Sequence, residues 1–189
     1  MARFRFPHAT YRRILFVTLC LAACGAGIPL PLAAQARATA TATPEPGPGY
    51  DTGDAWIDGR LADIDRYARA YPESFAAEVE RYAGASRAYV RGLLAQPGWN
   101  PGDAWYACFL ARALDTDCRS VVRARARLGR AGSWAQATSA LRGEDKPDPY
   151  PALRLALADS YRRWDRSLQP DAALRRALQQ RQRAAGEGR

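Results

Sequence analysis

Apolar residues recur at intervals of three and four along most of the chain after residue 50, the spacing that places them on one face of an α-helix. The first series consists of Ile57, Leu61, Ile64, Ala68 and Tyr71. A second series follows Pro72, a residue that suits the first turn of a helix, and consists of Phe75, Val79 and Tyr82. We therefore predict two helices that meet at Pro72.

The middle of the chain contains strong helix-start signals. Ser86 is placed to cap a short helix. Asn100 and Pro101 are the residue types preferred at the N-cap and at the first position of a helix, and Asp103 lies where a negative charge is favoured by the helix dipole. The helix that follows is apolar around most of its circumference as far as Leu114. We expect it to lie at the centre of the fold.

Two shorter helices are predicted next. Asp117 is a suitable cap for a helix that ends near Leu128 and Gly129. The segment Ser133-Trp134-Ala135-Gln136 has the form of a capping box, and Gly143 ends the short helix that it begins.

The C-terminal part of the chain contains two further helical patterns. The first begins at Pro151, and its apolar face consists of Leu153, Leu157, Tyr161, Trp164 and Leu168. The second begins near Pro170 and ends in the polar segment 181–183. No segment has the two-residue alternation of a half-buried strand. We predict an all-α fold, a single compact domain of seven to eight short helices over residues 50–185, followed by a tail at 186–189.

The first 36 residues have the organisation of a bacterial export signal. Four arginines and no acidic residue precede an apolar run that starts at Ile14. Glycines and prolines between Gly25 and Pro31 interrupt the run well short of the roughly 20 apolar residues of a membrane anchor. We expect cleavage after Ala36, in a small-x-small site; the alternative is lipidation of Cys24, because residues 21–24 resemble the lipobox of bacterial lipoproteins.

Residues 37–49 are rich in Ala, Thr, Pro and Gly and are predicted to form a disordered leader. The signal at 1–36 places the mature protein in the periplasm or outside the cell, with membrane attachment only through a lipid on Cys24.

Removal of the signal changes the chemistry of the chain. It takes away four arginines and lowers the formal net charge from +9 to +5. It also takes away His8, the only histidine, which excludes His-dependent catalytic triads and His-ligated zinc sites. Lys146, the only lysine, lies in a predicted surface loop, and no Gly-rich phosphate or dinucleotide motif is present. We expect no cofactor and no metal.

Cys108 and Cys118 are the only cysteines of the predicted domain, and two cysteines in an exported protein favour a disulfide. They lie on consecutive helices, so a turn between these helices would bring the two Cα atoms within the roughly 5.5 Å that a disulfide prefers. We predict a disulfide-braced helical hairpin. The alternatives are two separate buried thiols and, less favoured with two sulfurs and no histidine, a metal site.

Residues 98–141 resemble a pattern of uncharacterised exported bacterial proteins. The matching segments are Pro101-Gly102-Asp103, Trp105-Tyr106-Ala107-Cys108, Asp117-Cys118 and Ser133-Trp134. They lie within about a quarter of the chain and consist of cap and core residues. The resemblance implies a helical fold and export, and it brings no catalytic residue with it.

Between residues 118 and 142 the chain contains six arginines and no acidic residue. Arg119, Arg123, Arg127 and Arg130 have the spacing of one helical stripe. Such a stripe is commonly a solvated face, here paired with the acidic first half of the chain. The functional alternative is a face for an anionic envelope component, such as lipopolysaccharide or a polyanionic wall polymer, or for an acidic envelope protein. The segment 118–142 also resembles a helix-turn-helix, but export argues against nucleic-acid binding.

Carboxylates support catalysis without histidine, because glycan hydrolysis needs two positioned Asp or Glu side chains. The candidates are Asp63, Asp65, Glu73, Glu78 and Asp103. Asp103 and Glu73 are already explained as residues of helix starts. A carboxylate-dependent hydrolase of envelope glycans is therefore kept as an alternative function.

Trp105 and Trp134 occupy core positions of predicted helices, whereas Trp99 has no assigned place in the core and is free to make a surface contact. Together, these patterns predict an exported helical protein without catalytic residues, with a binding or scaffolding role in the cell envelope.

Overall fold

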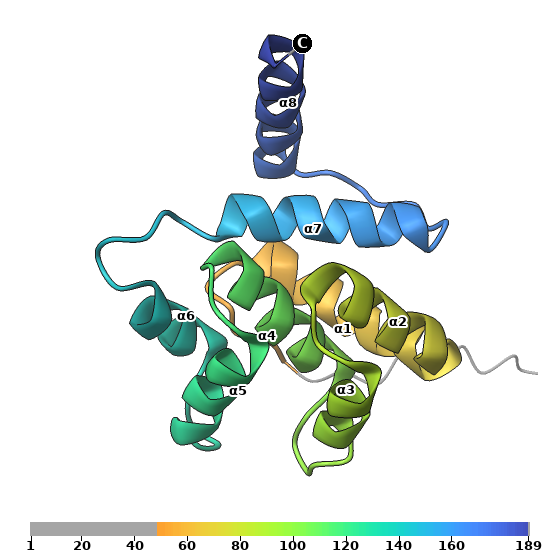
Figure 1. The fold of residues 1–189 in the computed structure, drawn as a ribbon, viewed down its shortest axis with the longest axis vertical. Helices are drawn as coiled ribbons and strands as arrows, with labels where there is room; N and C mark the ends of the chain where they lie inside the picture. Colours follow the sequence, from red (N-terminus) through yellow and green to blue (C-terminus); the bar gives the residue numbers. More distant parts are fainter. Residues whose placement is uncertain (1–48, 189) are drawn as a thin grey trace, which may run out of the picture. The chain divides into compact units, whose positions relative to one another are not determined.

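The computed structural model describes residues 49–188, which belong to one compact unit (Figure 1). Several predictions lie outside these residues: the signal at 1–36, cleavage after Ala36, the alternative lipidation of Cys24, and nearly all of the leader at 37–49. The described part contains eight helices and no strand, which confirms the all-α fold. The helices are α1 (Ala55–Ala70), α2 (Pro72–Ala83), α3 (Arg87–Leu94), α4 (Pro101–Ala113), α5 (Cys118–Arg127), α6 (Trp134–Arg142), α7 (Tyr150–Arg163) and α8 (Ala172–Glu187).

The helix starts follow the local capping signals of the sequence. Ser86, Asp117 and Ser133 each accept a hydrogen bond from a backbone N–H of the following first turn, as predicted for α3, α5 and α6. At α4 the carboxylate of Asp103 accepts a hydrogen bond from the backbone N–H of Asn100 at 2.9 Å. These predictions are confirmed because capping depends on residues that are neighbours in the chain.

The C-terminal boundaries differ from the prediction. The helix α7 ends at Arg163, so Leu168 lies in the following loop instead of on the helix. The chain leaves the helix because Asp165 has a left-handed backbone with φ 53° and Arg166 donates its backbone N–H back to the carbonyl of Tyr161. In addition, α8 continues to Glu187, beyond the predicted domain end at residue 185, since its last turns consist largely of good helix formers.

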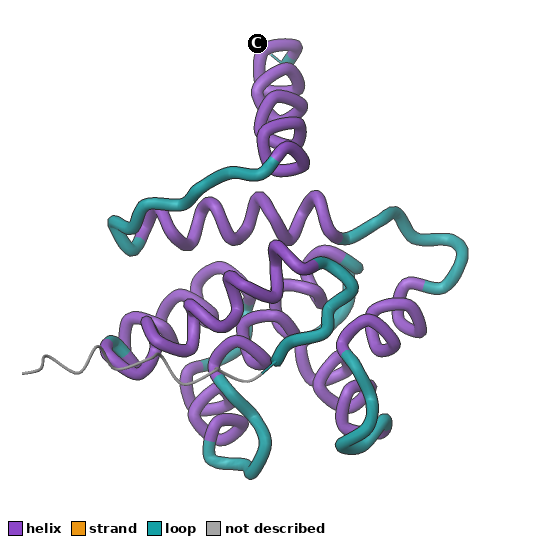
Figure 2. The backbone as a smooth tube through the Cα atoms, turned by 180° about the vertical axis from the view of Figure 1, so that it is seen from behind, coloured by secondary structure: helices purple, strands orange, loops and turns teal. Residues whose placement is uncertain are grey.

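The core is built around α4, which packs against α1, α2, α3, α5 and α7 (Figure 2). Trp105 and Tyr106 of α4 are fully buried, and each forms a hydrogen bond with another helix. The indole N–H of Trp105 donates to Ser160 of α7, and the hydroxyl of Tyr106 lies 2.9 Å from that of Thr138 in α6. The predicted central position of this helix is therefore confirmed. The helix α7 crosses the bundle, and α8 turns away from it with residues 179–188 exposed.

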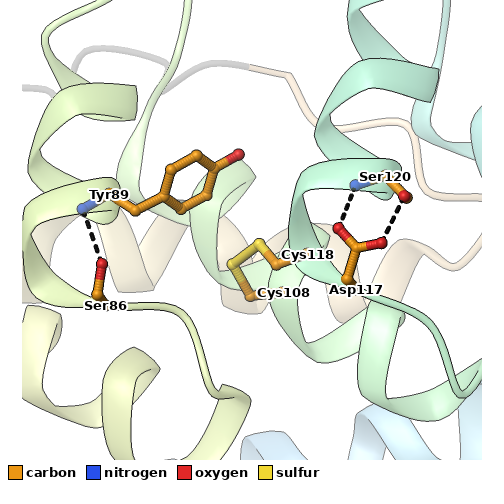
Figure 3. Close-up of a disulfide and its surroundings, with 6 residues drawn as sticks. All are labelled: Ser86, Tyr89, Cys108, Asp117, Cys118 and Ser120. Atoms are coloured by element: carbon orange, nitrogen blue, oxygen red, sulfur yellow. Dashed lines mark hydrogen bonds between the residues drawn. A yellow bond between two sulfur atoms is a disulfide. The ribbon is translucent and has the colours of Figure 1, made fainter.

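The predicted disulfide between Cys108 and Cys118 is present and joins the second half of α4 to the first residue of α5 (Figure 3). The two Cα atoms lie 4.4 Å apart. Cys108 is fully buried, and Cys118 is nearly so. Closing this short loop stabilises the hairpin by about 2–3 kcal/mol.

Two buried ion networks fix α7 to the rest of the fold. Arg154 pairs with Asp54 and Asp171, the N-caps of α1 and α8. Arg163 pairs with Glu78 of α2. Within residues 49–188, no helix combines the length and apolar character needed to cross a bilayer.

Candidate functional site

The exposed side of α5 carries three of the four arginines of the predicted stripe. Arg119, Arg123 and Arg127 follow one another at intervals of four residues and are exposed. We call these three residues the basic face. Within the described residues, none of them forms an ion pair, whereas arginines of α1, α3, α7 and α8 do.

These arginines lie on a solvated face, and within the described residues no ion pair joins them to the acidic first half of the chain. The physical reason is the position of α5, which packs against α4 and α6. The only acidic residue in those two helices is Asp103, in the first turn of α4. Arg123 is linked to Asp117 only through the hydroxyl of Ser120, which accepts from Arg123 and donates to Asp117. Apart from the contact of Arg119 with Tyr89 and the effect of the Arg123 charge on Asp117, the positive charge of the basic face is left to solvent or to a partner.

The fourth residue of the stripe, Arg130, does not lie on the helix. The helix α5 ends at Arg127, and Gly129 turns the chain with a φ of 65°, a conformation that favours glycine. Arg130 instead borders a cleft of about 450 Å³ between the α3–α4 loop, α4 and the end of α5. Arg125, which the stripe pattern did not single out, lines the same cleft.

Near the disulfide, the first turn of α5 contacts α3. The guanidinium of Arg119 lies over the ring of Tyr89, 4.9 Å from its centre. Burial raises the pKa of Tyr89, against the effect of the arginine charge. Hydrogen bonds from the hydroxyl and backbone N–H of Ser120 lower the pKa of Asp117 (Figure 3). These contacts hold the N-terminal end of the basic face in place.

The cleft is framed by contacts of Trp134, which is buried as predicted. The indole N–H of Trp134 donates to the carboxylate of Asp103 at 2.7 Å. The guanidinium of Arg125 lies 5.6 Å from the centre of the Trp134 ring and donates to the carbonyl of Gly129 at 2.9 Å. On the other side, Trp99 packs edge-on against Trp134, with ring centres 6.1 Å apart.

A second hollow of about 290 Å³ adjoins the cleft. The two share Gly98, Asp103 and Arg125, and the second is also lined by Tyr50 and Asp51. Asp103 and Arg125 therefore lie between two adjacent hollows.

Asp65 of α1 fixes the start of α4 on the side of that helix. Its carboxylate accepts hydrogen bonds from the hydroxyl of Tyr50 at 2.8 Å and from the backbone N–H of Gly102 at 2.7 Å. Burial raises the pKa of Asp65, and burial together with the charges of Asp103 and Asp65 raises that of Tyr50. Glycine is required at position 102 because a side chain there would collide with the Tyr50 ring. These groups position Asp103 at the cleft.

Each of the five carboxylates considered for catalysis has partners within the fold. Asp63, Glu73 and Glu78 form ion pairs with arginines. Asp65 and Asp103 accept the hydrogen bonds described at the start of α4. The structure thus gives all five a role in holding helices or loops together.

Comparison of the chain with family models, with curated proteins and with solved structures finds no match. The resemblance over residues 98–141 stays a prediction. The described residues contain no group of three or more His, Cys, Asp or Glu side chains that could hold a metal ion. The candidate site therefore consists of the basic face of α5 and the cleft at its end.

Proposed function

We propose that this protein is an exported, non-enzymatic binding protein of the cell envelope, and that the basic face of α5 holds an anionic polymer. The observation that carries the proposal is the unpaired state of Arg119, Arg123 and Arg127 within the described residues. Regularly spaced, exposed arginines that form no ion pair raise the local concentration of an anionic ligand.

The location outside the cytoplasm is supported by two features. The charged start and the apolar run of the first 36 residues are typical of an export signal. Disulfides such as the one between Cys108 and Cys118 persist in oxidising compartments. The N-terminal signal and the disulfide therefore favour the periplasm or the exterior.

Charge reversal of the basic face tests the proposal. We expect a variant with Arg119→Glu, Arg123→Glu and Arg127→Glu to bind purified lipopolysaccharide at least about tenfold more weakly, because three attractive charges become repulsive. Binding is measured at low salt and at about 0.15 M salt, where the difference between the proteins should shrink as screening increases. Circular dichroism checks that the helices are retained.

A matched control carries the same change of net charge on other helices, with Arg81→Glu, Arg176→Glu and Arg183→Glu. These arginines are exposed and form no ion pair in the described part of the chain. We expect the control to bind within about threefold of the unmodified protein. Equal loss in both variants would show that total charge, and not the basic face, determines binding.

A further inference from the structure

We propose that the cleft at the end of α5 binds one acidic sugar unit of the polymer, with its carboxylate on Arg125 and Arg130 and its ring against Trp99. This inference rests on the proposed function and names the class of its ligand, an acidic saccharide. Four features of the cleft carry it.

The first feature is a guanidinium that is held in place and still has free donors. Arg125 lies over Trp134 and uses one N–H for the carbonyl of Gly129. Among the described residues, its other N–H groups have no hydrogen-bond partner, and neither Arg125 nor Arg130 forms an ion pair. A guanidinium presents its N–H groups in a planar fork that matches the two oxygens of a carboxylate.

The second feature is that Asp103, which lines the same cleft, forms no ion pair with either cation. Its carboxylate accepts hydrogen bonds from Trp134 and from the backbone and side-chain amides of Asn100. A carboxylate has about four acceptor positions, so three are used inside the protein. The remaining position suits a sugar hydroxyl, which donates a hydrogen bond to it.

The third feature is the wall formed by Trp99. This residue is only partly buried, and its contact with Trp134 fixes its position at the cleft. An aromatic wall combined with a few placed polar groups is the usual make-up of a ligand site, and the cleft volume of about 450 Å³ lies within the range of such sites. A simple anion would leave the indole wall without a contact.

The fourth feature is the position of the cleft at the end of α5, next to the last arginine of the basic face. Arg127 is the last residue of α5 and of the basic face, and Arg130, three residues further along the chain, lines the cleft. The second hollow adjoins the cleft across Asp103 and Arg125. A chain of acidic sugar units would therefore place one unit in the cleft and further units toward the basic face, whereas the second hollow, which Asp51 and Asp103 line, disfavours a second carboxylate.

The test is isothermal titration calorimetry of the disulfide-bonded protein with a four-unit oligogalacturonate. We expect Trp99→Ala and Arg125→Met each to weaken binding about tenfold, as loss of an aromatic contact or a charge-assisted hydrogen bond does. Because Arg125 also contacts Trp134, the exposed loop variant Arg130→Met serves as a second measurement, with an expected loss of about threefold. Tyr71→Ala and Arg176→Met, at an exposed aromatic and an exposed arginine elsewhere, are expected to bind within about twofold of the parent.

Two further ligands define the class. The methyl-esterified oligomer keeps the rings and removes the charge, and inorganic phosphate keeps a charge and removes the ring; both are expected to bind at least about tenfold more weakly than the oligogalacturonate. Equal binding of the methyl ester, or phosphate binding as tight as that of the oligomer, would overturn the assignment to an acidic sugar.

The outcome also separates the two proposals. If the triple charge reversal abolishes binding of the oligomer while Trp99→Ala and Arg125→Met leave it unchanged, the cleft assignment is wrong and the basic face stands. If the cleft variants weaken binding of the oligomer but the charge reversal leaves lipopolysaccharide binding intact, the cleft holds the sugar unit and the proposed role of the basic face is wrong.

Discussion

Replacement of Arg154 by methionine is expected to lower the free energy of unfolding by about 3 kcal/mol, because it leaves two partly buried carboxylates without their cation. The side chain of Arg154 is 10% exposed and pairs with Asp54 and with Asp171. Both partners also cap helices: Asp54 accepts from the backbone N–H groups of Trp56 and Ile57, and Asp171 caps α8. One arginine thus joins the starts of α1 and α8 to α7.

Urea unfolding followed by circular dichroism measures this effect. A variant that combines Arg154→Met with Asp54→Asn and Asp171→Asn should regain about 1 kcal/mol, because asparagine is also a good N-cap and the unpaired charges are gone. Arg162→Met, at an exposed arginine of the same helix, is the control and should change stability by no more than about 0.5 kcal/mol. An effect of Arg154→Met as small as that of the control would refute the role of this network.

Replacement of Glu78 by alanine is expected to destabilise the fold by about 3–4 kcal/mol, since Glu78 is 5% exposed and joins α2 to α7. Its carboxylate accepts hydrogen bonds from the hydroxyl of Ser160 at 2.6 Å and from the guanidinium of Arg163. Ser160 in turn accepts the indole N–H of the buried Trp105. Loss of the carboxylate leaves a cavity, an unpaired guanidinium and an unpaired hydroxyl.

Thermal and urea unfolding of four further variants, among them the single variant Arg163→Ala, separate these contributions. Glu78→Gln keeps the shape and loses the charge, so its effect should be about 2 kcal/mol. Glu73→Ala removes an exposed acid of the same helix and should have an effect below about 0.5 kcal/mol. In the double variant Glu78→Ala with Arg163→Ala, the loss should be smaller than the sum of the single losses. Strictly additive losses would show that the pair does not interact.

The helices and the disulfide could be predicted from the sequence because their signals are local. Asn100, Asp117 and Ser133 occupy the N-cap positions of helices that follow them directly, and Cys108 and Cys118 are only ten residues apart in the chain. The end of α7 was missed since it depends on the left-handed backbone of Asp165, for which the apolar spacing gives no signal.

The candidate site could be predicted only in part. The periodicity of Arg119, Arg123 and Arg127 indicates the basic face, but Arg125 lies off this stripe. Its place in the cleft depends on Trp134, which comes from the next helix. The two ion networks were missed for the same reason, because Arg154 and Asp54 are far apart in the chain and meet only in the folded state.

Export is the central claim, since the mature chain must leave the cytoplasm to bind an envelope polymer. Intact mass spectrometry of the protein from cells, before and after reduction, tests this claim. We predict an N-terminus at Arg37 and a gain of two hydrogens on reduction, from the bond between Cys108 and Cys118. An N-terminus at Met1 with both thiols free would contradict it.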